Sequence, residues 1–127
     1  MIHVYNVHTE DYSSHEGNFY CGRSKGGNPL SNPYTFNGVK SNLAKLSFKT
    51  REEAIKAYEA YFDKMYGTDE ELTNAFDEIY ELYKEGKDIY LGCFCAPNEC
   101  HCNVIAERLQ RRLIKERLME RKKCKQR

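Results

Sequence analysis

The chain has 127 residues, of which 40% are hydrophobic and 31% charged, and its formal net charge is +1. This length and balance exclude a disordered chain and predict one globular domain with a core of its own. No run approaches the roughly 20 apolar residues of a membrane-spanning helix, so we expect no membrane partner. The first residues lack the basic start and long apolar run of a signal peptide, which favours a cytoplasmic location.

Positive charge is concentrated in the last part of the sequence. Half of the 20 Lys and Arg residues, but only three of the 19 Asp and Glu residues, lie in residues 103–127. Residues 108–127 could therefore bind the phosphate backbone of a nucleic acid, or their basic face could neutralise the acidic helices expected earlier in the chain, within one chain or across a dimer. The segment has no Tyr or Phe to stack on single-stranded bases, which favours the second interpretation.

Two short strands are expected first. Residues 2–7 (IHVYNV) are apolar on both faces, which is typical of a central strand. Residues 18–21 (NFYC) predict a second strand that stops before Gly22. A loop rich in Gly, Asn and Pro follows over residues 22–38, and Tyr34 and Phe36 within it indicate packing against the body.

Two helices are expected between residues 50 and 86. Thr50 and Glu53 form a capping box, and apolar residues then recur at helical spacing until Gly67, a left-handed cap. Thr68 and Glu71 repeat this start signal for a second helix. The apolar stripes of both helices predict core packing rather than a cofactor site.

Residues 88–95 (DIYLGCFC) predict a buried strand, and a last helix is expected to begin at Asn98 or Glu99. We expect residues 1–110 to form a single α/β domain and residues 111–127 a basic helical extension, anchored to the body by Leu109, Leu113 and Ile114. The residues of the last helix that we expect to point inward are Val104, Ile105, Leu109 and Leu113, and the same spacing can extend to Leu118.

The order of these elements predicts a small layered α/β domain, with a short, at least partly parallel sheet flanked by about three helices. The connection between residues 22 and 88 contains two helices. It is therefore long enough for a crossover between parallel strands, whereas a hairpin needs only a tight turn.

Four of the six cysteines fall within ten residues. In a reducing compartment they are expected to be thiols, metal ligands or nucleophiles rather than disulfides. Cys93 and Cys95 share one face of the strand, while Cys100, His101 and Cys102 lie in the first helical turn, where the dipole lowers the pKa of a thiol. A strand that feeds a helix start in this way also offers backbone amides to an anion.

This cluster has three interpretations. Cys93, Cys95, Cys100 and His101 are ligand types that bind zinc, although their spacing departs from the usual Cys pairs. Cys95 or Cys100 could instead be a nucleophile helped by His101, in an enzyme acting on a nucleotide or sugar-phosphate. In the third interpretation, which we favour, the cysteines pack the strand edge while the helix start and His101 bind an anionic ligand.

The second half of the site is expected in the loop that follows Gly22. Arg23 stands at the end of a strand, where a guanidinium can bind phosphate through two parallel hydrogen bonds. Gly26 and Gly27 allow a ligand to approach the backbone closely. We therefore expect a binding domain for a nucleotide or another phosphorylated small molecule. The predicted ligand-binding residues are Arg23, Asn32, Cys93, Cys95, Cys100 and His101.

Two motifs, Y-x-G-R…P-L-x-N-P-Y and L-x-C-x-C-x-P-x-x-C-H, are similar to those of an uncharacterised family of small phage and bacterial domains of unknown function. Ser31 and Cys102 stand where that family usually has Gly. The resemblance covers residues 2–110 and implies a phage or bacterial origin and a shared pocket, but no activity. A phage-encoded member could sequester a host signalling nucleotide in the host cytoplasm. The matching residues are Tyr20, Gly22, Arg23, Pro29, Leu30, Asn32, Pro33, Tyr34, Leu91, Cys93, Cys95, Pro97, Cys100 and His101.

Overall fold

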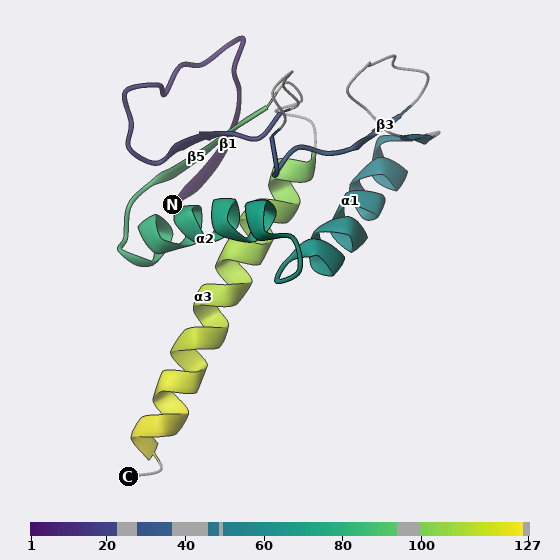
Figure 1. Ribbon diagram of the computed structural model, residues 1–127. Helices are drawn as coiled ribbons and strands as arrows, with labels where there is room; N and C mark the ends of the chain where they lie inside the picture. Colours follow the sequence, from purple (N-terminus) through teal and green to yellow (C-terminus); the bar gives the residue numbers. More distant parts are fainter. Residues whose placement is uncertain (23–27, 37–45, 49, 94–99, 126–127) are drawn as a thin grey trace.

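The structure is a computed structural model that describes residues 1–22, 28–36, 46–48, 50–93 and 100–125 (Figure 1). It has the predicted α/β class, with helices packed against a small parallel sheet. The elements in chain order are β1 (Ile2–Asn6), β2 (Asn18–Tyr20), β3 (Tyr34–Phe36), β4 (Leu46–Phe48), α1 (Arg51–Met65), α2 (Glu70–Lys84), β5 (Ile89–Cys93) and α3 (His101–Lys125).

The main sheet has three strands in the order β1-β5-β2. Both outer strands run parallel to β5, with Ile2 opposite Ile89 and Asn18 opposite Tyr90. The predicted parallel crossover is thus confirmed, since β2 reaches β5 through α1 and α2. The prediction of a central first strand was wrong, because β1 lies at an edge of this sheet and β5, buried at every position, lies in the middle.

The two faces of this sheet are covered by different elements. Ile89, Leu91 and Cys93 alternate toward the helical side, where each is at most 1% exposed. On the opposite face, Tyr90 stacks on Tyr12, with ring centroids 4.2 Å apart. The segment between β1 and β2 therefore covers this second face, which explains how an edge strand can be apolar on both sides.

A second, two-stranded sheet is formed by β3 and β4, which run parallel with Tyr34 opposite Leu46. Both strands contact α1. This sheet was missed in the sequence, where residues 22–38 were assigned to a loop. Strands of three residues are too short to show the alternation on which strand prediction depends.

The ends of α1 follow the signals in the sequence. The Thr50 hydroxyl accepts a hydrogen bond from the backbone amide of Glu53 at 3.2 Å, as a helix cap does. Gly67, just after the helix, has φ of 90°, a conformation that glycine adopts without strain. The Thr50 half of the predicted capping box and the left-handed Gly67 are therefore confirmed.

The start of α2 lies one residue later than its signal suggested. Asp69, not Thr68, is the capping residue, because its carboxylate accepts from the backbone amide of Leu72 at 3.1 Å. The Thr68 hydroxyl instead donates to the carbonyl of Lys64 in the last turn of α1. One polar residue therefore closes the first helix while the next residue opens the second.

The two halves of α3 have different surroundings. Ile105 and Leu109 are fully buried and Leu113 is partly buried, whereas Ile114 is 60% and Leu118 52% exposed. Figure 1 shows the C-terminal half extending well beyond the other elements. The inward position predicted for Leu118 and the anchoring role predicted for Ile114 were wrong, because the helix has left the body before it reaches them.

Two basic residues of α3 bind the acidic helices. Arg108 lies 2.8 Å from Asp63 and 3.2 Å from Glu59 on α1, and Arg112 lies 2.7 Å from Asp77 on α2. At these two positions the basic face neutralises its own chain, as one of the two interpretations predicted. Among the helices described, none is long and apolar enough to cross a membrane.

Candidate functional site

The carboxyl ends of three parallel strands meet the N-terminus of α3 at one end of the sheet. Tyr20 at the end of β2 lies opposite Gly92 of β5. Backbone pairing continues one residue further on both sides, since Val7 donates to the carbonyl of Cys93 and Cys21 to that of Gly92, both at 2.9 Å. Ligands of parallel α/β proteins usually bind at this edge.

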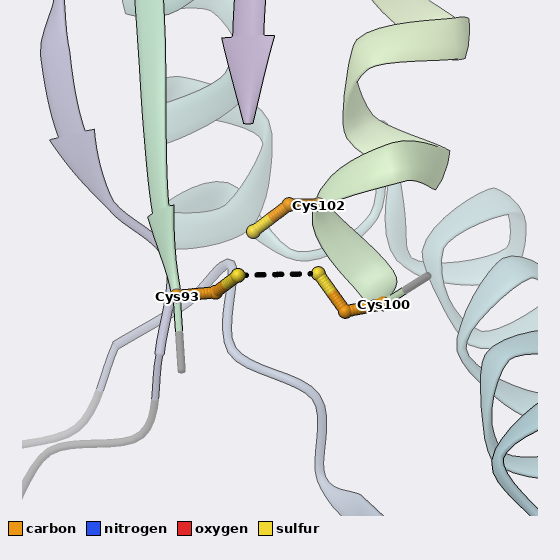
Figure 2. A group of neighbouring side chains, drawn as sticks. All are labelled: Cys93, Cys100 and Cys102. Atoms are coloured by element: carbon orange, nitrogen blue, oxygen red, sulfur yellow. Dashed lines mark hydrogen bonds between the residues drawn. The ribbon is translucent and has the colours of Figure 1, made fainter. Parts of the chain in front are cut away.

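Three cysteine sulfurs point toward one another at this edge (Figure 2). The Sγ atoms of Cys93, Cys100 and Cys102 all lie within 4.8 Å of one another, and the Cys100 thiol donates to Cys93 Sγ at 3.4 Å. Cys93 ends β5, Cys100 immediately precedes α3, and Cys102 lies in its first turn. Each side chain is at most 3% exposed, so the sulfurs form a buried cluster.

Cys21 belongs to the same cluster and was missed as a site residue. Its side chain is fully buried, its thiol donates to the carbonyl of Phe19 at 3.8 Å, and it is one of the neighbours that raise the pKa of the Cys102 thiol. Because Tyr20 lies opposite Gly92, Cys21 is level with Cys93 on the neighbouring strand. The place of Cys21 in this cluster follows from the pairing of β2 with β5, and the sequence alone gives no signal for that pairing.

The Cys102 thiol is held in its neutral form. Hydrogen bonds with Cys100, Cys21 and Cys93, together with burial, raise the pKa of the Cys102 thiol well above its ordinary value. We expected the helix dipole to lower thiol pKa values here. At Cys102 the neighbouring sulfurs and the loss of solvent outweigh the dipole, which disfavours a thiolate nucleophile at this position.

His101 connects the start of α3 to the end of β2. Its Nε2 lies 2.5 Å from the carbonyl oxygen of Cys21, so this nitrogen carries the proton and donates it. The imidazole packs edge-to-face on Tyr58, with ring centroids 5.0 Å apart, and His101 is 8% exposed. Through Nε2 the ring therefore holds two elements together rather than facing a ligand.

The first turn of α3 is closed by its own side chains. The Oδ1 atom of Asn103 accepts from the backbone amide of Cys100 at 2.8 Å, which is the returning half of a capping box. α3 begins at His101. The expected start at Asn98 or Glu99 falls among residues 94–99, which lie outside the described residues.

Residues 28–33 are fastened to the end of β2. The side-chain amide of Asn28 donates to the carbonyl of Tyr20 at 2.7 Å and to that of Gly22 at 3.0 Å. The Asn28 side chain also accepts from the backbone amide of Leu30 at 3.1 Å. The Asn28 side chain therefore provides hydrogen-bond partners for three backbone groups where the chain leaves β2.

Tyr58 joins this segment to the cysteine cluster. Its hydroxyl donates to the carbonyl of Leu30 at 2.7 Å, and its ring contacts His101. Burial, with smaller effects from Cys21 and other neighbours, raises the pKa of Tyr58 well above its ordinary value, so the hydroxyl remains a donor. The sequence indicated only a core position on α1 for this residue.

The structure brings Cys93, Cys100 and His101 together, as predicted. Asn32 is also buried, at 9% exposed, in the segment that is fastened to the same edge. Arg23 and Cys95 lie outside the described residues, so their part in the site stays a prediction.

Comparison with known proteins gives a family but no activity. No curated protein and no solved structure matches the chain significantly. A family model matches residues 4–111, which extend from β1 into the first half of α3 and include the whole cysteine cluster. The match leaves out most of the basic C-terminal segment, residues 108–127. On this evidence, the chain belongs to DUF4326, a family described as a domain of unknown function.

Proposed function

We propose that this chain is a binding domain for a nucleotide or another phosphorylated small molecule, which it holds at the carboxyl edge of its three-stranded sheet. The observation that carries the proposal is the convergence of three parallel strand ends on the N-terminus of α3. Backbone amides and the positive end of the helix dipole favour phosphate at such a place. The ligand class follows from that charge and from the position in the sheet.

The loop after β2 supports the same proposal. Gly22 and Asn28 lie side by side, joined by a hydrogen bond of 3.0 Å. The proposal assigns Arg23, which follows Gly22 in the sequence, to the phosphate group, because a guanidinium can donate two parallel hydrogen bonds to it. The proposal also assigns Asn32 to this binding site, where its polar side chain would face the ligand.

The alternative of an enzyme acting on a nucleotide or sugar-phosphate receives less support. A nucleophilic thiol must be accessible and ionised. Cys100 is 3% exposed, and Nε2 of His101 donates to a backbone carbonyl rather than activating a thiol. Cys95 is the remaining candidate nucleophile, and its alkylation rate is the measurement that would revive the enzyme proposal.

The alternative of nucleic-acid binding through residues 108–127 also receives less support. Arg108 and Arg112 already bind carboxylates of α1 and α2. Because these two guanidinium groups already form ion pairs within the chain, α3 has fewer positive charges available to bind a phosphate backbone. Binding to random-sequence DNA that persists at physiological salt and disappears on deletion of residues 115–127 would favour this alternative.

The proposal extends to a biological role if the chain is encoded by a phage. Such a protein would sequester a host signalling nucleotide, and sequestration requires affinity without turnover. The compound recovered from the complex should therefore be chemically unchanged. Chromatography of the released ligand separates this role from the enzyme alternative, in which the compound is altered.

Thermal unfolding of the purified protein tests the proposal. Mono-, di- and triphosphates, cyclic nucleotides, ADP-ribose and inorganic phosphate are each titrated, because a ligand of the native state raises Tm with concentration. Arg23→Ala is expected to abolish the shift. Arg117→Ala, the same change on the exposed half of α3, is expected to retain it. The absence of any shift, or an equal shift in Arg23→Ala, would overturn the proposal.

A further inference from the structure

We propose that Cys21, Cys93, Cys100 and Cys102 form an all-thiolate site for one zinc ion. The site lies beneath the carboxyl edge of the sheet, where β2, β5 and α3 meet. Every ligand atom is a buried sulfur of this chain, so the metal content can be measured separately from the phosphorylated ligand proposed above.

The sulfur separations suit a tetrahedral metal. With Zn–S bonds of about 2.3 Å, the sulfurs of a tetrahedral site lie about 3.8 Å apart. Those of Cys93, Cys100 and Cys102 are all within 4.8 Å of one another, with 3.4 Å between Cys93 and Cys100. These values lie on both sides of the ideal one, so shifts on the order of 1 Å suffice to admit the ion.

Cys21 supplies the fourth ligand. It is fully buried, and its backbone amide bonds to the carbonyl of Gly92, which places it beside Cys93 at the end of the neighbouring strand. His101 is not suited to this position, because its Nε2, 4.0 Å from the Cys102 sulfur, donates to the Cys21 carbonyl. That hydrogen bond instead fixes the backbone of a ligand, as the residues around metal ligands commonly do.

The contacts favour a metal over a disulfide. In a disulfide each sulfur has one partner at about 2.05 Å, whereas the Cys102 sulfur lies within 4.8 Å of the sulfurs of both Cys93 and Cys100. A set of four sulfurs without carboxylate ligands selects thiophilic ions and excludes Mg²⁺ and Ca²⁺.

The charge of the bound site can be accommodated. On binding, the four thiols release their protons to solvent and leave a zinc–thiolate group of net charge −2. This group lies at the N-terminus of α3, where the positive end of the helix dipole stabilises negative charge. Since the four ligands close the coordination sphere, the ion is structural and holds α3 against the ends of β2 and β5.

Metal analysis of protein purified without chelators is the first test. We expect about one zinc per chain by plasma mass spectrometry, as for closed structural sites. Cys102→Ser and Cys21→Ser are expected to lose most of this zinc. Cys124→Ser is the matched control, because it removes a cysteine roughly 33 Å further along α3. Unchanged zinc in both cluster variants would overturn the ligand set.

A second measurement uses the unaltered chain, because a cysteine variant can fail to fold. The protein is stripped of metal under reducing conditions and titrated with Co²⁺. We expect the visible bands of tetrahedral cobalt and near-ultraviolet thiolate bands to saturate at one ion per chain, and Zn²⁺ but not Mg²⁺ to raise Tm.

Two results would overturn the proposal. One is negligible zinc together with no thiolate spectrum on addition of Co²⁺. The other is a disulfide between Cys93 and Cys100 in protein that was alkylated during lysis. Retention of zinc by Arg23→Ala keeps this proposal separate from the nucleotide proposal, whose failure would leave the metal content unchanged.

Discussion

Arg108 on α3 binds Asp63 on α1 through two parallel hydrogen bonds, from Nε to Oδ1 at 2.9 Å and from Nη2 to Oδ2 at 2.8 Å. The Arg108 side chain is 10% exposed, whereas that of Asp63 is 52% exposed. The pair therefore lies at the edge of the core, with water on one side only. It holds α1 against the half of α3 that carries Cys102.

Arg108→Lys keeps the positive charge but removes the planar guanidinium group, whose two donors bind one carboxylate. An ammonium group cannot make both parallel bonds to one carboxylate, so we expect a loss of about 1–2 kcal/mol in the free energy of unfolding. Urea unfolding followed by circular dichroism measures this loss. Arg111→Lys, at a side chain 62% exposed and paired with Glu107 on the same helix, should change stability by less than about 0.5 kcal/mol. Equal losses of unfolding free energy in Arg108→Lys and Arg111→Lys would show that the paired hydrogen bonds of Arg108 do not stabilise the fold.

Acid should weaken the same pair. Hydrogen bonding from Arg108 lowers the pKa of Asp63 below its ordinary value of 3.8, with burial acting in the opposite direction. Because the folded-state pKa is the lower one, the stabilisation is complete above the unfolded-state value and is lost as the pH falls through the folded-state value. Stability should thus decline below about pH 4, and less steeply in Asp63→Asn than in the exposed control Glu78→Gln. The measurement is the urea midpoint of each variant as a function of pH. If the two variants lose stability with pH equally steeply, the Arg108–Asp63 pair does not contribute to acid sensitivity.

Tyr58→Phe removes a buried donor without changing the ring. The carbonyl of Leu30 loses its partner in a site closed to water, which costs about 1–3 kcal/mol. Amide hydrogen exchange in residues 28–33 should also accelerate. Tyr83→Phe is the control, since that hydroxyl has no hydrogen bond to any described residue. Unchanged exchange and stability in Tyr58→Phe would show that the segment is held by other contacts.

Gly17→Ala should disturb the pairing of β2 with β5. A Cβ atom at Gly17 would collide with the backbone oxygen of Asp88. The backbone cannot move away without losing the bond from the Tyr90 amide to the Gly17 carbonyl, which is 2.8 Å long. We expect a loss of about 1–3 kcal/mol, typical of overpacking, measured by thermal unfolding. Wild-type stability would mean that the two strands separate easily at this point.

The parallel sheet and the helices could be predicted because their signals are local. Thr50 and Gly67 determine where α1 begins and ends through contacts within a few residues. The length of the chain between residues 22 and 88, with its two helices, favours a parallel crossover over a hairpin. Alternation along a strand likewise placed Cys93 inside, next to the residues that begin α3.

The order of the strands and the composition of the cysteine cluster depend on contacts between distant residues. β1 can be apolar on both faces because Tyr12 covers one face by packing on Tyr5. Since Tyr12 lies outside β1, the residues of the strand alone do not indicate this cover. Cys21 joins the cluster only because β2 pairs with β5. Leu118 continues the apolar spacing of α3 after the body has ended, so periodicity alone assigned it wrongly.

The arrangement β1-β5-β2 also determines when this sheet can form during synthesis. Neither outer strand pairs with the other in the described sheet, and both wait for β5. At ordinary translation rates, β1 leaves the ribosome on the order of 10 s before its partner has been made. For that interval the nascent chain carries two short strands with unsatisfied edges, the feature by which unfinished chains bind chaperones or one another. The arrival of residues 89–93 therefore marks the moment at which both outer strands can first find their partner.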